Sequence, residues 1–195
     1  MKVRLYASEF KRLIDNTKRF VSTEYCSDAR MNWIYLNINA ELKTIKATAL
    51  DGHKISVEYG EIVETDESFS CYIKPNIPKI LKSNRYVDLE LIGGRLYAEI
   101  GDSITRYVQP EGEYYKVDEM LDGMMQGEKT MTIGFDANLL KDALASIGKF
   151  GERTPIAIID LYDPKSPIII KSGKRGNKQN IKAVLPVNIP HQEES

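Results

Sequence analysis

The sequence predicts an α+β protein built from three copies of one module, in which a strand is followed by a helix and three further strands. The first observation behind this prediction is the alternation of apolar and polar residues in many short runs, which is typical of strands in antiparallel sheets. The second is a set of hairpin turns, such as Gly93-Gly94 and Gly101-Asp102, between successive runs. The third is the order of these features, which restarts twice along the chain at a period of roughly 65 residues.

The first module begins with an alternating strand at residues 2–7. Ser8 is a favourable N-cap, and the apolar residues from Phe10 to Val21 then recur at helical spacing, with charged residues on the opposite face. Because such a helix must bury its apolar face, it has to pack against a sheet or another helix. Three strands are expected next, at residues 32–39, 44–49 and 55–59.

The second module restarts with a strand at residues 69–74. A short helix over residues 75–83 would direct Ile77, Ile80 and Leu81 inward. Three strands joined by hairpin turns complete the module, at residues 86–92, 95–100 and 103–108.

The third module begins with a strand at residues 131–135, after which Asp136 caps a helix with an apolar stripe. Three strands are expected to follow, at residues 155–161, 167–171 and 180–187. A stretch rich in glycine and acidic residues precedes this module and is typical of a linker. We therefore expect a two-module domain over residues 1–117, a linker over 118–129 and a single module over 130–195.

The bulk composition restricts the class of protein. The 195 residues carry a formal net charge of −1, so an anionic partner must be met by locally segregated charge. Cys26 and Cys71 lack metal-ligand spacing and are too few for a disulfide-stapled scaffold. The first ten residues lack the apolar core of a signal peptide, and no apolar run is long enough to span a membrane. We expect a soluble, cytoplasmic protein with reduced cysteines and no membrane partner.

The turn at residues 49–57 is the most informative local feature. Asp51 and Gly52 form a hairpin turn that places His53 and Lys54 at an exposed corner. A hydrolase triad of Asp51, His53 and Ser56 is disfavoured, because all three residues crowd into one hairpin and no second motif supports them. Two alternatives remain: an ordinary surface turn, or a motif formed by the whole stretch of residues 49–57.

Read as a whole, the string resembles a signature of the bacterial DNA polymerase III beta subunit, the DNA sliding clamp. That family carries Thr-Asp-Gly-His-Arg-Leu in its middle domain, where this chain has Leu50-Asp51-Gly52-His53-Lys54-Ile55. Four further matches follow in the family's order, namely Phe10-Lys11-Arg12-Leu13-Ile14-Asp15, Glu113-Tyr114-Tyr115-Lys116-Val117, Gly134 to Leu144 and Val184-Leu185-Pro186-Val187-Asn188-Ile189. The resemblance covers the family's middle domain and the second half of its third domain.

This resemblance implies a DNA-clamp-like fold with antiparallel sheets outside and helices on the inner face. It also implies a non-enzymatic processivity factor of replication or repair, without catalytic residues, cofactor or metal. Such a protein contacts or encircles duplex DNA and tethers polymerase-type partners through a groove for linear peptides. Because the family's first domain and the front half of its last domain have no counterpart here, a non-ring peptide-binding decoy or adaptor of phage or mobile-element origin is the alternative.

By resemblance, the peptide groove combines residues from the middle domain and from the last strand of the third domain. The structural alternative is that these residues form only an apolar interface between two modules. Leu50, Lys54 and Gly112 differ from the residues that the family has at these positions. The expected groove residues are Trp33, Leu50, Gly52, His53, Lys54, Ile55, Lys116, Val117, Ala183, Leu185, Pro186 and Val187. The tail over residues 190–195 extends beyond the family's terminus.

Two further surfaces are expected. Basic residues on the outer faces of the first two helices would meet DNA phosphates without reading bases, although a charged helix face is usually only solvated. The stripe of the third helix, left without a partner module, would contact another chain in a homo-oligomer, either a dimer or a tetramer. The expected DNA-facing residues are Lys11, Arg12, Arg19, Lys79 and Lys82, and the expected oligomer contacts are Leu139, Leu140, Ala143, Leu144 and Ile147.

Overall fold

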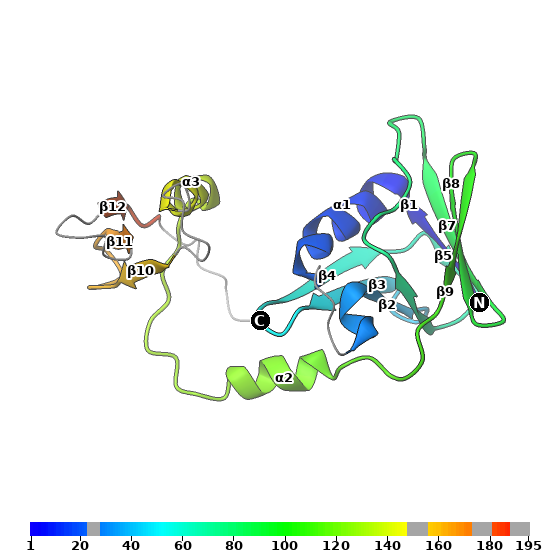
Figure 1. Ribbon diagram of the computed structural model, residues 1–195, viewed down its shortest axis with the longest axis horizontal. Helices are drawn as coiled ribbons and strands as arrows, with labels where there is room; N and C mark the ends of the chain where they lie inside the picture. The colour runs from blue at the N-terminus through cyan, green and yellow to red at the C-terminus, as the bar shows by residue number, and fades with distance from the viewer. Residues whose placement is uncertain (23–27, 148–155, 173–180, 188–195) are drawn as a thin grey trace. The chain divides into compact units, whose positions relative to one another are not determined.

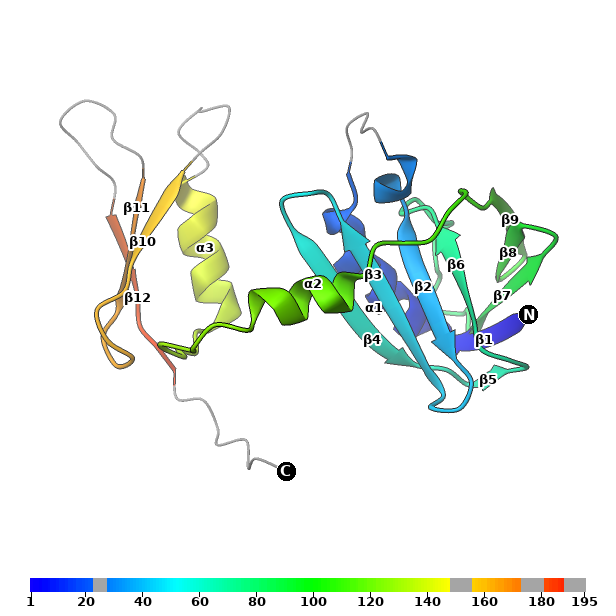
Figure 2. The ribbon, with the colours of Figure 1, turned by 90° about the horizontal axis from the view of Figure 1, so that it is seen from below.

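The computed structural model describes residues 1–22, 28–147, 156–172 and 181–187. Its contacts divide the chain into two compact units, Met1–Met120 and Leu121–Ser195 (Figures 1 and 2). Each unit combines a helix with antiparallel sheet, so the predicted α+β class is confirmed. Cys26 and the tail over residues 190–195 lie outside the described residues. No helix in the described parts of the chain is long and apolar enough to cross a membrane.

Unit 1 contains two sheets, a four-stranded one with the order β4-β3-β2-β6 and a five-stranded one with the order β5-β1-β7-β8-β9. The first strand of each module pairs with the other module: β1 pairs with β7, and β6 pairs with β2, both antiparallel. The elements are β1 (Lys2–Tyr6), α1 (Ala7–Thr17), β2 (Ile34–Asn39), β3 (Thr44–Leu50), β4 (Ile55–Glu61), β5 (Glu64–Thr65), β6 (Phe69–Ile73), β7 (Tyr86–Ile92), β8 (Arg95–Ile100) and β9 (Ser103–Val108).

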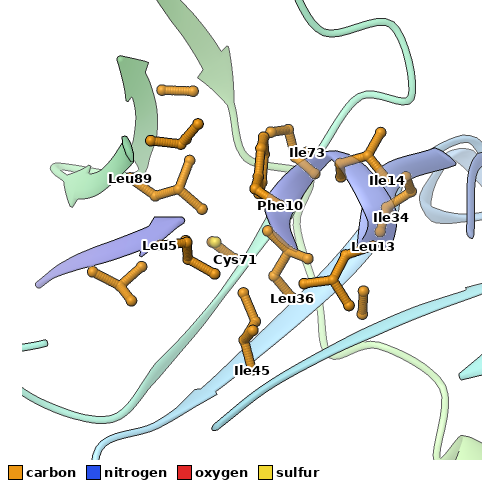
Figure 3. Close-up of a cluster of buried hydrophobic side chains, with 14 of the residues drawn as sticks. Leu5, Phe10, Leu13, Ile14, Ile34, Leu36, Ile45, Cys71, Ile73 and Leu89 are labelled. Atoms are coloured by element: carbon orange, nitrogen blue, oxygen red, sulfur yellow. The ribbon is translucent and has the colours of Figure 1, made fainter. Parts of the chain in front are cut away.

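One apolar core joins the two modules of unit 1. Helix α1 contacts β3 and β4 of one sheet and β1 and β7 of the other. Its residues Phe10, Leu13 and Ile14 are buried among side chains from both sheets, including Leu36 and Leu89 (Figure 3). The predicted cap is wrong, because the helix begins at Ala7 and its N-cap is Tyr6, two residues before Ser8.

The second module has no helix between β6 and β7. Residues 75–83 are irregular, so the helix predicted there is wrong. Pro78 lacks a backbone N–H and restricts the residue before it to extended conformations, which opposes a helix. Ile77 and Ile80 still pack against the core, as expected, whereas Leu81 is exposed.

Helix α2 (Val117–Met124) occupies the first part of the segment predicted to be a linker. The chain divides into its two units within this helix, after Met120. Asp118 and Glu119 lie in the first turn of α2, where negative charge stabilises the helix.

Unit 2 consists of α3 (Ala137–Ile147) and a sheet of β10 (Ala157–Asp160), β11 (Ile168–Ser172) and β12 (Ile181–Val184), in that order. The predicted cap is confirmed, because Asp136 Oδ1 accepts hydrogen bonds from the backbone N–H groups of Asn138 (2.8 Å) and Leu139 (3.3 Å). The strand expected at residues 131–135 is reduced to one bridge, in which the Val187 N–H donates to the Gly134 carbonyl oxygen at 2.9 Å.

Candidate functional site

The corner between β3 and β4 is a tight turn organised by one carboxylate. Asp51 Oδ1 accepts hydrogen bonds from the backbone N–H groups of His53 (3.0 Å) and Lys54 (3.1 Å). Burial alone would raise the pKa of Asp51, but these hydrogen bonds and the nearby Lys54 ammonium lower it overall. Gly52 has φ +88°, a conformation that other residues adopt only with strain. Ser56 is buried and in register with Ala49 of the core, whereas His53 is exposed.

The Lys54 side chain connects this corner to the segment that follows α1. Its Nζ donates to the Arg19 carbonyl oxygen, lies 3.4 Å from Asp51 Oδ2 and sits 5.6 Å from the centroid of the Phe20 ring. Arg19 and Phe20 belong to a short 3-10 helix, Lys18–Phe20, that continues α1. Lys54 therefore shapes the rim of the corner through contacts of its own, and roughly half of its side chain stays exposed.

An aromatic layer covers the face of the four-stranded sheet that points away from α1. Ile34 and Leu36 lie in the core, so Tyr35 between them points to the opposite face. The Tyr114 ring stacks on Tyr35 with centroids 4.7 Å apart and planes within 8°, and it meets Tyr72 edge-on at 5.8 Å. Burial raises the pKa of Tyr114, and burial together with the neighbouring Tyr35 raises the pKa of Tyr72 to about 12.

Polar contacts at both ends hold the covering segment, residues 111–118, in place. Arg30 donates to the Glu113 carbonyl oxygen and forms a bidentate pair with Asp28, which also accepts from the Tyr115 hydroxyl. Hydrogen bonds from Arg30 and Tyr115 hold the pKa of Asp28 far below its usual value. At the other end of the segment, Lys46 of β3 forms an ion pair with Asp118.

Leu50 and Val117, both expected in the peptide groove, are buried, and Val117 belongs to the covering segment itself. Their side chains are 3% and 4% exposed, and neither belongs to the main core cluster. Leu50 is in register with Ile55, which is half-buried. Lys116 is exposed beside Val117 and pairs with Glu119 at 2.9 Å. Because Leu50 and Val117 are buried, a ligand could reach them only at depth, whereas His53, Lys54 and Lys116 are exposed.

Trp33 lies immediately before β2 and is half-buried. It meets Tyr107 edge-on, with ring centroids 6.4 Å apart, and Lys74 Nζ lies 3.9 Å from the centroid of the Trp33 ring. Burial lowers the pKa of Lys74. Trp33 is thus a fixed aromatic side chain with one face held by a cation.

The remaining groove residues belong to unit 2. Ala183 lies in β12 in register with Ile169 of β11. Leu185 and Val187 follow β12 and are exposed, and Pro186 between them is half-buried. A groove that combines these residues with those of unit 1 remains a prediction.

The basic residues of α1 and of the 3-10 helix that continues it are, with one exception, paired with carboxylates. Lys11 and Lys18 both contact Asp15, and Arg12 contacts Glu9 (2.7 Å) and Glu58 (2.8 Å). The expected basic face of α1 is therefore close to neutral. Arg19 is the exception, since its side chain forms no ion pair with any described residue. Lys79 and Lys82 lie on the irregular segment after β6, so their prediction as residues of a helix face is wrong.

Several residues that build the site were not singled out in the sequence. Tyr35, Tyr72 and Tyr114 come from three separate segments, and only their long-range stacking reveals them. Gln109 was missed as well: its side-chain amide accepts from the Tyr72 N–H at 2.6 Å and donates to the Tyr72 carbonyl oxygen at 3.0 Å, which satisfies the edge of β6. Within the described residues, no group of three or more His, Cys, Asp or Glu side chains could hold a metal ion.

No protein-family model and no curated protein matches the chain. Solved structures do match. The chain aligns with the DNA polymerase sliding clamp of Bacillus subtilis with a TM-score of 0.78 and 17% identity, covering 95% of this chain and 49% of the clamp. It aligns with the DNA polymerase III subunit beta of Pseudomonas aeruginosa with a TM-score of 0.75, 14% identity and coverage of 95% and 50%. For the DNA polymerase III beta chain of Streptococcus pneumoniae, the TM-score is 0.76, the identity 13% and the coverage 96% and 50%.

These identities are low, so the alignments concern the fold. The chain spans about half the length of the clamps that it matches. The recognition drawn from the Asp51-Gly52-His53 corner and the motifs on either side of it is confirmed at the level of architecture. The chain therefore has the fold of the DNA polymerase III beta sliding clamps over about half of their length.

Proposed function

We propose that this chain is a non-enzymatic, clamp-like accessory protein of DNA replication or repair that tethers polymerase-type partners by binding a short linear peptide. The observations behind the proposal come from unit 1, where Leu50 and Val117 are buried outside the main core cluster and Ile55 is in register with Leu50. Trp33, before β2, supplies an aromatic ring held by Lys74. Peptide sites combine apolar pockets with a few polar groups at the rim, and His53, Lys54 and Lys116 supply those groups here.

The second part of the site comes from unit 2. The exposed Leu185 and Val187 flank Pro186 after β12, and apolar side chains in this setting suit the same kind of ligand. In the proposal, this strand end binds an apolar side chain of a linear peptide, as the unit 1 corner does. The protein acts in the cytoplasm, where replication partners are found.

Contact with duplex DNA is a weaker component of the proposal. Since Lys11, Arg12 and Lys18 are paired with carboxylates, few phosphates would be neutralised, and binding would fall only gently with salt. Arg19 is the residue best placed to contact a phosphate. This charge pattern favours a protein held near DNA by its assembly and partners, and it also fits the adaptor alternative.

The peptide proposal is tested by fluorescence anisotropy with a labelled clamp-binding peptide. We expect saturable binding that weakens about tenfold in the Trp33→Ala variant, since an aromatic anchor of this kind contributes about 1–2 kcal/mol. Tyr97→Ala is the matched control, because Tyr97 is also half-buried but lies on β8 of the other sheet, and it should leave the affinity unchanged. Equal affinities for both variants would refute the proposed site.

A second assay separates a clamp from an adaptor. A ring that encircles DNA is retained on a closed circle and slides off a linear duplex, whereas an adaptor binds peptide without retention on either. Retention on circular DNA alone supports the clamp, and peptide binding without any DNA retention supports the adaptor.

A further inference from the structure

Unit 1 shows how two modules of this fold complete each other. Each module gives its first strand to the sheet of the other, where it pairs with the strand that follows the helix position: β1 with β7, and β6 with β2. Each first strand also contacts the end of its own module. In the first module β1 pairs with β5, and in the second the Gln109 side chain, just after β9, forms hydrogen bonds with the backbone of Tyr72 in β6. The result is the single core that both modules share.

Unit 2 has the parts of one such module. Helices α1 and α3 both have 11 residues. Helix α1 begins at Ala7, directly after β1, and α3 begins at Ala137, shortly after the first-strand segment at residues 131–135. Strands β10, β11 and β12 follow α3 in the antiparallel order in which β2, β3 and β4 follow α1. The Gly134–Val187 bridge repeats the contact between a first strand and the end of its own module.

Equivalent positions have opposite exposures in the two units. By their places in the 11-residue helices, Ile14 of α1 corresponds to Leu144 of α3; Ile14 is 1% exposed and Leu144 is 38% exposed. Leu140, Ala143 and Ile147 pack against β11 and β12. Ile147, expected as an oligomer contact, is buried in this way.

The uncovered surface of unit 2 is the side that β10 occupies. Ile159 is in register with Ile170, which is buried beneath α3, so both point to the same face of the sheet. Ile159 is nevertheless 47% exposed, because α3 packs on β11 and β12. Ile133 and Phe135 of the first strand are only half-buried, whereas Val3 and Leu5 of β1 are fully buried.

Two backbone edges are also unpaired among the residues that the structure describes. Strand β10 is an edge strand, at the position where β2 receives β6 in unit 1. The first-strand segment, residues 131–135, makes only its one bridge. Neither edge carries the protective charges typical of an exposed strand, since residues 131–135 are uncharged and Asp160 of β10 is paired with Lys171 of its own sheet.

We propose that a second copy of this chain completes unit 2, with residues 131–135 of each copy adding antiparallel to β10 of the other. Unit 2 is a suitable partner for itself because it supplies both halves of the interaction, a free first strand and a free β10 edge. A twofold axis joins these halves reciprocally, as an isologous interface requires. Leu144 and Ile159 of the two copies then form a shared core, as Ile14 and the core residues of β2 do in unit 1. This inference concerns a surface that the proposed peptide function does not use.

The test is sedimentation of the full chain, whose mass is 22.2 kDa, at tens of micromolar. We expect a dimer or a multiple of a dimer. Ile159→Glu should raise the dissociation constant of the dimer at least a hundredfold, and Leu144→Lys should do the same. Two matched controls should leave it unchanged: Ile158→Glu, whose side chain is 42% exposed on the other face of β10, and Leu139→Lys, which corresponds to the polar Glu9.

Hydrogen exchange then tests the strand pairing itself. Amides of residues 131–135 and of β10 should become protected as the protein concentration rises, while those of β11 stay constant. A monomer at tens of micromolar overturns the proposal, as does a dimer that Ile159→Glu and Leu144→Lys leave intact or one without concentration-dependent protection. A chain that is monomeric alone but pairs one-to-one with a bacterial clamp also overturns it. Peptide affinity measured on the Ile159→Glu variant reports the unit 1 site separately, so each proposal can fail without the other.

Discussion

Replacement of Tyr114 by Ala tests whether the covering segment holds the candidate site together. Tyr114 is 9% exposed, stacks on Tyr35 and meets Tyr72 and Tyr115 edge-on. Loss of a buried aromatic side chain typically costs about 3–5 kcal/mol of unfolding free energy. The lower end applies here, because this layer lies near the surface and the Arg30–Glu113 and Lys46–Asp118 contacts still anchor the segment. We therefore expect a loss of about 3 kcal/mol.

The assay is urea unfolding followed by tryptophan fluorescence. Trp33 is the single tryptophan of the chain and lies in unit 1, so its signal reports that unit even when unit 2 unfolds separately. At an unfolding slope typical of a domain of this size, a loss of about 3 kcal/mol moves the midpoint by about 2 M urea. Tyr114→Phe keeps the stacked ring and should change the stability by less than about 1 kcal/mol. A loss below about 1 kcal/mol in Tyr114→Ala would refute the structural role assigned to the aromatic layer.

Three further predictions concern unit 1. A Cβ at Gly60 would lie 3.0 Å from Leu13 Cδ1, so Gly60→Ala should overpack the contact between α1 and β4. We expect the unfolding free energy, measured with urea, to fall by about 1–3 kcal/mol. Burial raises the pKa of Tyr72 to about 12, so the stability from its neutral hydroxyl is complete below pH 10 and is lost as the pH rises toward 12; Tyr72→Phe should flatten this alkaline decrease in a series of melts. The lowered pKa of Asp28 stabilises the protein above about pH 4 and this stability is lost at lower pH, so Asp28→Asn should lower the urea midpoint at pH 7, by less than Tyr114→Ala does, and weaken the acid dependence. If the stability of Asp28→Asn falls at low pH as steeply as that of the unchanged protein, the stabilising role assigned to the Asp28–Arg30 pair is contradicted.

The elements with strong local signals could be predicted from the sequence. The hairpins around Gly52, Gly93-Gly94 and Gly101 follow from turn residues that accept positive φ, and each lies where expected. Helices α1 and α3 follow from apolar residues at helical spacing.

The helix expected over residues 75–83 shows where this reasoning fails. The spacing of Ile77 and Ile80 fits a helix, and both residues do pack inward. Pro78 and the Asn84 side chain, which accepts from the Leu81 N–H at 2.7 Å, favour an irregular path instead. Periodicity predicted the burial correctly and the backbone incorrectly.

The candidate site could be predicted only in part. The corner at residues 50–55 was accessible as a continuous string, whereas the Tyr35, Tyr72 and Tyr114 layer depends on contacts between segments up to 79 residues apart. The neutral character of α1 was also hidden, because Glu58, a partner of Arg12, comes from β4. Side-chain pairing across elements needs the fold.

The most direct test of the central claim is a titration of the isotopically labelled chain with a clamp-binding peptide, followed through its backbone amide signals. The account predicts saturable shifts at Trp33, across residues 50–55 and 114–117, and after β12 at residues 185–187. Signals from β8, on the other sheet of unit 1, should stay unchanged. Shifts confined to β8, or no saturable shift at any peptide concentration, would contradict it.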